Sequence, residues 1–317
     1  MSEKLRLYYQ QPAGRWEETL PVGNGHLGAM IWGGPREELL GLNEESLWSG
    51  YERDRNNPGA YDSLAEVRRL IFEGRCTEAE RMIQENMLGE HGESYMPLGN
   101  LKIEYRNIRP SGEAAGRDGA WAGNKTECDR NDNGVTNYTR SLDLEEAVAC
   151  VDFDAEGVHY HREVFASYPA KALILLFTAS EPVMDLELSL DSMMKCTFSE
   201  AEDGLVFRGR CPEHVDPIPI NKGEDAVVWG YRGRRFSGRI RMLEGDGVLS
   251  AEGERIRLKG ASRAVFAVEA VRAALLEDSP YEALKEAHIA DYRSIYSGVE
   301  LYLGNSRKRP RMSGFRN

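Results

Sequence analysis

Residues 148–179 read VACVDFDAEGVHYHREVFASYPAKALILLFTA. Apolar and polar residues alternate in 148–154 and again in 158–167, which is typical of β-strands with one buried face. The run 171–179 is continuously apolar and ends at turn signals, so it also favours a strand. Since no helical pattern separates the three runs, they predict antiparallel rather than parallel pairing.

The same strand pattern continues on both sides of this stretch. Many short strands separated by turn residues, without helices between them, indicate a sandwich of antiparallel sheets. We therefore predict a mainly β fold, a large antiparallel β-sandwich. Further strand-like runs lie at 101–105, 183–191, 204–209, 238–247, 253–260 and 263–271.

Two helices are expected to interrupt the β pattern early in the chain, as an inserted helical hairpin. Ser63 and Glu66 have the spacing of a capping box and predict the start of the first helix, and Gly74 stands where its C-terminal cap is expected. Thr77 and Glu80 repeat the capping box and predict the start of the second.

A third helix is predicted to begin near Ser279, with Pro280 at its first position. The segment 107–137 is polar and rich in glycine, long for an ordered loop, and contains Trp121, for which the sequence offers no role. Residues 305–317 are basic in an otherwise acidic chain. They suggest a tail that binds an anionic partner or a nuclear signal, but the end of a shifted or broken reading frame fits them better.

Composition predicts a globular protein with a substantial core. The chain has 317 residues, 41% of them hydrophobic, and a net charge of −12, which disfavours a nucleic-acid partner. No apolar run is long enough to span a membrane, and the first residues lack a secretory signal, so we expect a cytoplasmic protein. The five cysteines are scattered without a metal-binding spacing and are expected to be reduced.

The segment 21–34, PVGNGHLGAMIWGG, contains a G-x-G-x-x-G pattern at Gly23, Gly25 and Gly28. A dinucleotide site requires a buried strand before this pattern and a helix after it, and neither neighbour qualifies. We expect no nucleotide and no cofactor. The glycines instead fit tight turns beside a strand.

The segment 41–64 offers the most distinctive cluster of candidate binding residues. Asn43, Glu44 and Trp48 supply hydrogen-bonding groups and an indole face, which suit the binding of a sugar ring. The alternative, favoured by residue statistics, is that Leu42, Leu47 and Trp48 belong to the core and the polar side chains cap turns.

Three histidines are candidates for a functional role. His26 lies in the glycine-rich turn, where it is free to contact a ligand or another domain, although a structural role is more common. His159 and His161 share one face of a strand, but no third ligand accompanies them. We therefore predict no metal site.

Six segments, in order, carry a family resemblance. They are LPVGNGHLGAMIWGG, LNEESLWSG, RNNPGAYDSLAEVRRLIFEGRCTEAE, YMPLGNLKIEY, SLDLEEAVACVDFDAEGVHYHREVFASYP and AHIADYRSIYSGVELYLG. Together they resemble the amino-terminal part of glycoside hydrolase family 95, the α-L-fucosidases, from about residue 7 to residue 303.

The resemblance implies an enzymatic function whose catalytic residues are not expected within this sequence. The family's members hydrolyse terminal α-1,2-linked fucose, and some prefer L-galactose, with inversion in a helical barrel that follows the β-sandwich. Inversion requires a general acid and a water activated on the opposite face of the sugar. None of the family's catalytic positions falls within this sequence, so no catalytic residue is assigned.

The expected domain boundaries follow from the same resemblance. They are a sandwich domain at 1–275, the start of a helical linker at 276–304 and an aberrant, disordered tail at 305–317. The expected partners are a fucosylated oligosaccharide, bound through the absent barrel, and the barrel itself. The candidates for facing that barrel or its substrate are Asn24, His26, Asn43, Glu44 and Trp48. A separate carbohydrate-binding module and one chain of a split enzyme are the alternatives.

Overall fold

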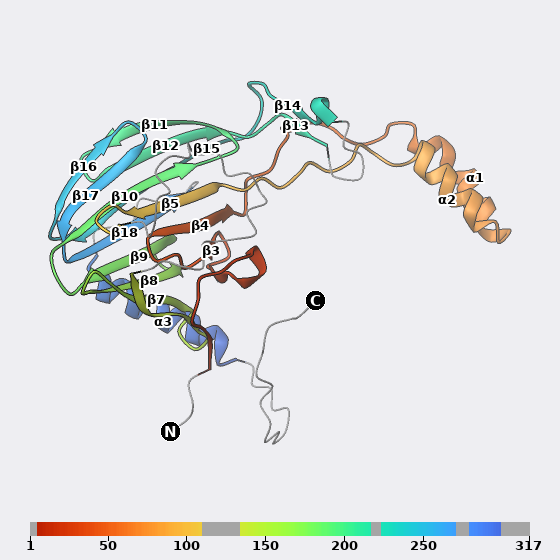
Figure 1. The fold of residues 1–317 in the computed structure, drawn as a ribbon. Coiled ribbons are helices and arrows are strands. Elements are labelled where there is room, and N and C mark those ends of the chain that lie inside the picture. Colours follow the sequence, from red (N-terminus) through yellow and green to blue (C-terminus); the bar gives the residue numbers. More distant parts are fainter. Residues whose placement is uncertain (1–4, 110–133, 217–222, 271–278, 299–317) are drawn as a thin grey trace, which may run out of the picture.

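The computed structural model of the protein describes residues 5–109, 134–216, 223–270 and 279–298. Two antiparallel sheets lie face to face and form a β-sandwich (Figure 1). The predicted mainly β, antiparallel sandwich is therefore confirmed. Trp121 and the tail 305–317 lie outside the described residues, as does most of the segment 107–137.

The larger sheet has nine strands and the smaller sheet seven. The order of the nine-stranded sheet is β1 (Arg6–Tyr9), β6 (Val135–Asp143), β7 (Val148–Ala155), β8 (Val158–Ser167), β9 (Ala172–Ala179), β18 (Arg263–Ala270), β15 (Arg235–Gly245), β12 (Gly204–Arg210) and β11 (Lys195–Ala201). The order of the seven-stranded sheet is β16 (Val248–Glu252), β17 (Arg255–Ala261), β10 (Met184–Asp191), β5 (Gly99–Tyr105), β4 (Glu37–Glu44), β3 (Leu27–Ile31) and β2 (Leu20–Gly23).

Four smaller elements lie outside the two large sheets in the described β-rich part of the chain. A 3₁₀ helix lies at Trp16–Glu18 and another at Gly223–Ala226. The short strands β13 (His214–Val215) and β14 (Val227–Val228) pair with each other outside the two large sheets.

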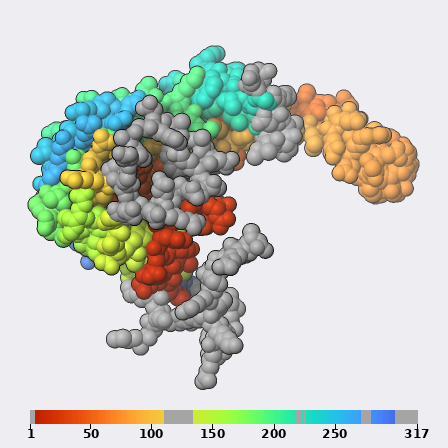
Figure 2. Space-filling view, viewed as in Figure 1, coloured from red at the N-terminus to blue at the C-terminus, as the bar shows by residue number. Residues whose placement is uncertain are grey.

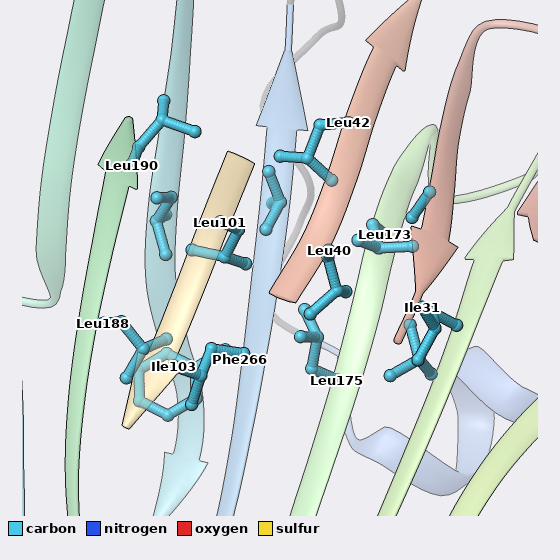
Figure 3. Packing of buried hydrophobic residues seen from close by; sticks show 14 of the residues in the cluster. Ile31, Leu40, Leu42, Leu101, Ile103, Leu173, Leu175, Leu188, Leu190 and Phe266 are labelled. Carbon is cyan, nitrogen blue, oxygen red and sulfur yellow. The ribbon is translucent and has the colours of Figure 1, made fainter. Parts of the chain in front are cut away.

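The main core lies between the two sheets. Because side chains alternate along a strand, each sheet turns every second residue toward the other, and most of these residues are apolar. Leucines of β4, β5 and β10 meet residues of β9 and β18 in this layer (Figure 3). Burial of this continuous apolar layer is the main stabilising contribution to the fold.

The continuous apolar run of β9 is explained by burial on both faces. Leu173, Leu175 and Phe177 point into the main core, whereas Ile174 and Leu176 belong to a second cluster on the outer face of the nine-stranded sheet. The helix α3 (Tyr281–Tyr296) supplies Tyr281 and Leu284 to that cluster and so covers this face. The predicted third helix is thus confirmed.

The helix α3 starts at Tyr281, with Pro280 just before its first residue rather than at it. No side chain of Pro280 or its neighbours caps the helix locally, and the backbone N–H of Tyr281 donates to Glu244 Oε1 at 2.6 Å. Since Glu244 lies on β15, the helix is anchored to the sheet at its first turn. The negative charge of a carboxylate at the N-terminus of a helix also interacts favourably with the helix dipole.

The predicted helical hairpin is present as α1 (Ala60–Phe72) and α2 (Cys76–Asn86), and it projects well beyond the sandwich (Figure 1). Gly74, with φ +77°, ends α1 as predicted, because its N–H donates to Ile71 O and that of Arg75 donates to Leu70 O. We call α1, α2 and the two extended segments that carry them the arm (49–59, 60–86 and 87–94).

Both predicted capping boxes of the arm are wrong. Asn57 Oδ1 accepts from the Gly59 N–H at 2.9 Å, so a turn folded by Asn57 starts α1 at Ala60 and leaves Ser63 inside the helix. The second helix likewise begins one residue before Thr77, without a side-chain cap.

A buried ion pair joins the two sheets. Arg162 of β8 pairs with Glu38 of β4, and both side chains are completely buried. The Glu38 carboxylate also accepts from the backbone N–H groups of Trp32, Gly33 and Leu39. Burial raises the pKa of Glu38, and Arg162 and these N–H groups oppose that rise. The pair fixes the position of β4, whose end carries the candidate site.

Candidate functional site

The glycine-rich turn joins β2 to β3 as a tight hairpin, with Gly25 at φ +87°. Asn24 Oδ1 accepts from the N–H groups of His26 and Leu27 at 3.0 and 2.8 Å, and its Nδ2 donates to Ser167 O on the opposite sheet at 2.8 Å. A strand, not a helix, follows the last glycine. The expectation that no strand precedes the pattern is wrong, because β2 ends at Gly23, whereas the helix that a dinucleotide site requires is absent at β3.

His26 extends from this turn and is about half exposed. Its Nδ1 lies 2.5 Å from Glu45 Oε1, and its ring stacks on Tyr168 with the centroids 5.8 Å apart. The backbone N–H of Glu45 also donates to His26 O. The ring therefore belongs to a surface contact that joins the ends of β3, β4 and β8.

Asn43 and Glu44 lie next to each other on β4 but face opposite ways. Asn43 is exposed and pairs in register with Gly28. Glu44 is only 4% exposed, and its Oε2 accepts from both the N–H and the hydroxyl of Ser46 at 2.9 and 2.8 Å. Glu44 therefore stabilises the turn that ends β4, as the structural alternative predicted.

Trp48 lies just after this turn, with 45% of its surface exposed. Its Nε1 donates to Glu45 O at 3.1 Å, and its ring meets the edge of Tyr95 at a centroid distance of 5.4 Å. The alternative that placed Leu42, Leu47 and Trp48 in the core is right for the two leucines, which are 1% and 0% exposed, and wrong for the tryptophan.

These residues form one patch, which we call the aromatic surface: His26, Glu45, Trp48, Tyr95 and Tyr168. The aromatic surface contains the predicted candidates His26 and Trp48. Asn43 is exposed on β4. Asn24 and Glu44 stabilise the turns that carry His26 and Trp48. Sequence reasoning missed Tyr95 and Tyr168. The one signal for Tyr95 was its place in the segment YMPLGNLKIEY, which carries part of the family resemblance.

The arm begins at the aromatic surface and is held there by a buried carboxylate. Glu93, with a side chain 6% exposed, accepts from Ser49 Oγ at 2.7 Å and Arg55 Nη2 at 2.8 Å, and lies 3.2 Å from His214 Nδ1. Burial raises the pKa of Glu93, but the hydrogen bonds from Ser49, His214 and the Val215 N–H outweigh burial, so the pKa is lowered. We call these residues the base cluster.

The base cluster gives a testable prediction. Replacing Glu93 with alanine leaves Arg55 and His214 without their shared acceptor, so we expect the free energy of unfolding to fall by about 2 kcal/mol. Urea denaturation measures this loss, and amide exchange at Ser49 and Ser94 should accelerate. The matched control is Glu78→Ala, which removes an exposed ion pair within the arm and should leave the free energy of unfolding almost unchanged. Equal losses of unfolding free energy in Glu93→Ala and Glu78→Ala would contradict the stabilising role of the base cluster.

His159 and His161 share a face of β8, as predicted, and each pairs with an aspartate of β7. The Nδ1 atoms lie 2.7 Å from Asp154 and Asp152 respectively. A partly open cavity of about 440 Å³ lies beside His159, and Asp154 and Ser180 contribute to its lining. These polar groups already hydrogen-bond with His159. Among the residues that the structure describes, no group of three His, Cys, Asp or Glu side chains could hold a metal ion.

Four cysteines lie in the described ranges and all are free: Cys76, Cys150, Cys196 and Cys211. Burial raises the pKa of Cys150 to about 12 and that of Cys211 to about 11, so both thiols stay protonated at neutral pH. Cys128 lies outside the described residues. No helix in the described part of the chain has the length and apolar character required to cross a membrane.

Comparison with known proteins assigns this sandwich to a family of N-terminal domains. Residues 7–117 and 122–274 match the family model described as "Glycosyl hydrolase family 65, N-terminal domain". "Alpha-L-fucosidase 2" of Arabidopsis thaliana is 28% identical over 337 residues, covering 96% of this chain and 37% of the relative. "Probable alpha-fucosidase A" of Aspergillus niger is 24% identical over 310 residues, covering 90% of this chain and 36% of the relative.

The chain therefore spans little more than a third of the length of the curated relatives it matches. Among solved structures, a "Putative kojibiose phosphorylase from human microbiome" aligns with 93% of this chain and 38% of its own, with a TM-score of 0.48 and 10% identity.

Proposed function

The chain belongs to the family of glycosyl hydrolase family 65 N-terminal domains, and we propose that it serves as the amino-terminal, non-catalytic domain of an α-L-fucosidase of glycoside hydrolase family 95. The names of its relatives in Arabidopsis and Aspergillus support the activity. The six sequence segments that resemble that family support the finer family assignment. The substrate class we propose is a glycan with terminal α-1,2-linked fucose.

The single observation that carries this role is the aromatic surface. Its rings are about half exposed, and they are held by contacts of His26 with Glu45 and of Trp48 with Glu45 and Tyr95. Such a surface stacks well on a flat partner but does not surround a sugar. We propose that it faces the helical catalytic domain and helps to close the sugar pocket of that domain.

Catalysis by inversion needs a general acid and a general base with room for a water between them. The buried carboxylates near the aromatic surface are already occupied, since Glu44 accepts from Ser46 and Glu93 holds the base cluster. We therefore assign proton transfer to the catalytic domain and positioning to this chain. Alone, the chain should release no fucose.

An activity and binding assay tests this proposal. The chain is incubated with 2′-fucosyllactose, and fucose release and the heat of binding are both measured. We expect neither, and we expect fucose release when the part of the Arabidopsis relative outside its match to this chain is added as a separate polypeptide. Hydrolysis by the chain alone would refute the non-catalytic role.

A stand-alone carbohydrate-binding module is the second candidate, favoured by the exposed indole of Trp48 beside Asn43 and Glu45. It requires measurable affinity for 2′-fucosyllactose without turnover, and loss of that affinity in Trp48→Ala. The matched control is Trp16→Ala, because Trp16 is 61% exposed on the first 3₁₀ helix. Absence of binding heat would exclude this candidate. A split enzyme, with a separately encoded barrel, predicts the same restored activity as the leading proposal.

A further inference from the structure

A row of three cations crosses the nine-stranded sheet where β11, β12 and β15 lie side by side. Lys195 of β11 pairs in register with Arg210 of β12, and Arg210 pairs with Arg235 of β15. Residues directly opposite each other on neighbouring strands point to the same face of the sheet, and two strand spacings amount to about 10 Å. Like charges in this arrangement destabilise a sheet, and a local cost of this kind is typical of a functional surface.

The row lies on the outer face of the sheet, open to solvent. Cys196 and Phe236, the next residues along β11 and β15, pack against the main core, so the cations point away from it. Lys195 and Arg235 are exposed, and Arg210 is half-buried. Figure 2 shows the turquoise part of the chain, which includes β13, β14 and the start of β15, at the surface between the body of the sandwich and the arm.

The cations of this face lack carboxylate partners. Arg208, two residues before Arg210 on β12, is also exposed. Farther along β15, the charges of Arg239 and Arg241 are balanced in part by Asp203. In the part of the chain that the structure describes, no carboxylate forms an ion pair with Arg208 or with any residue of the row. Such a local excess of positive charge, in a chain of net charge −12, attracts an anion.

A second row, two residues along each strand, adds hydroxyl groups. Thr197, Arg208 and Ser237 are directly opposite one another on β11, β12 and β15, and all three are exposed. Because side chains alternate, they point to the same face as the first row. Hydroxyls hydrogen-bond with the oxygens of a sugar, while guanidinium groups bind the paired oxygens of an oxyanion. We call the two rows the basic face: Lys195, Thr197, Arg208, Arg210, Arg235 and Ser237.

Aromatic residues border the basic face. Lys195 Nζ lies 4.8 Å from the centroid of the Trp229 ring. Arg210 Nη1 donates to the carbonyl oxygens of Tyr231 and Gly233, at 3.0 Å for Gly233, so the segment 229–233 is held beside the row. Tyr231 is 80% exposed. Aromatic rings beside hydrogen-bonding groups suit the apolar faces of sugar rings, which a ligand of charge alone does not require.

We propose that the basic face binds an extended glycan that carries carboxylate or sulfate groups. The cations supply charge complementarity along about 10 Å of the ligand, and the hydroxyls and aromatic rings suit its sugar rings. A nucleic acid is the less favoured occupant, because the net charge of −12 repels a continuous phosphate backbone. This inference rests on the proposed function and deepens it, since it adds acidic groups to the glycan on which the enzyme acts.

Binding of short acidic glycans to the 317-residue chain tests the inference. The probes are a heparin octasaccharide, which carries sulfate and carboxylate groups, and octagalacturonate, which carries carboxylates alone; maltooctaose is the uncharged control. We expect binding of at least one acidic glycan and no binding of maltooctaose by calorimetry at about 50 mM NaCl. Binding should be lost at about 500 mM NaCl, because salt screens exposed charges. Comparison of the two acidic probes shows whether sulfate is required.

A double variant of the basic face identifies the residues. Arg208→Gln/Arg235→Gln should bind the acidic glycan at least about tenfold more weakly, because it removes charge-assisted hydrogen bonds. Its urea midpoint should equal or exceed that of the wild type, since it relieves repulsion between like charges. The matched control is Arg68→Gln/Arg81→Gln, which makes the same change of net charge at two exposed arginines of the arm and should bind as the wild type does.

Four outcomes would overturn the inference. They are no binding of either acidic glycan by the wild type, equal binding by the wild type and the basic-face variant, equal weakening in the two double variants, and tighter binding of oligouridylate than of both acidic glycans. Each leaves the proposed function intact, because restored fucose release from the neutral 2′-fucosyllactose is measured separately. Failure to restore fucose release overturns the proposed function without changing the glycan affinity measured for this chain.

Discussion

Arg162→Met should lower the free energy of unfolding by about 3 to 5 kcal/mol, because it leaves the carboxylate of Glu38 buried without its cation. Both side chains are completely buried between the sheets, and Arg162 also donates from Nη2 to Gly34 O at 3.0 Å. Breaking one partner of such a pair costs far more than the pair contributes, since a charge in the interior has no water to solvate it. Urea denaturation monitored by tryptophan fluorescence measures the loss.

Two further variants sharpen this test. Glu38→Leu combined with Arg162→Met removes both charges and should recover part of the stability, because the Gly33 N–H and the Gly34 C=O still lose these partners. Lys102→Met breaks an exposed pair with Asp191 on the seven-stranded sheet and should cost less than about 1 kcal/mol. If Arg162→Met and Lys102→Met had similar effects, the ion pair would not be holding the two sheets together.

Raising the pH from 6.5 to about 9 should lower the free energy of unfolding by about 2 to 3 kcal/mol through His161. His161 Nδ1 lies 2.7 Å from Asp152 and its Nε2 lies 3.2 Å from Glu163, and these hydrogen bonds raise the pKa of His161 to about 9. Glu163 in turn accepts from Tyr281 and Lys285 of α3. Because the folded pKa is raised, the stabilisation is complete below pH 6.5 and is lost as the pH rises through about 9.

At acidic pH, the free energy of unfolding should depend on the protonation of Glu163. Burial raises its pKa, but hydrogen bonds from His161, Lys285 and Tyr281 outweigh burial and lower the pKa to about 2. Its stabilisation is therefore complete above pH 4.5 and is lost as the pH falls toward 2. Unfolding free energies measured from pH 3 to 10 should show both declines.

The histidine contribution has a matched control. His161→Gln should flatten the decline between pH 6.5 and 9, whereas His159→Gln, which changes a more exposed ring on the same face of β8, should preserve it. If the free energy of unfolding of His161→Gln declined over this pH range as steeply as that of the wild type, another group would be the cause of the decline.

Sequence reasoning succeeded where the signal is local. Alternation along 148–154 and 158–167 predicted two strands because a strand at a sheet surface buries every second side chain. Gly74 predicted the end of α1, since glycine readily adopts the left-handed conformation found there. The capping boxes at Ser63 and Thr77 failed because neighbouring backbone turns start each helix earlier.

The candidate site was predicted only in part. His26 and Trp48 do lie on one exposed surface, but Glu44 is a turn residue and Tyr95 and Tyr168 come from distant parts of the chain. No pattern within a short segment reports that Tyr168, at the end of β8, stacks on a turn at the edge of the other sheet.

By itself the sequence determined the strands, the antiparallel sandwich, the inserted helical hairpin and the likeness to the amino-terminal domain of a fucosidase, because each depends on neighbouring residues and their spacing. Only the tertiary structure decided that α3 covers the outer face of β9, that Arg162 is buried against Glu38, and that the arm extends outward from the sandwich. The physical reason is that these features arise from contacts between residues far apart in the chain. Hydrophobic burial is non-directional, so a short stretch of sequence does not specify which distant residues its apolar side chains will meet.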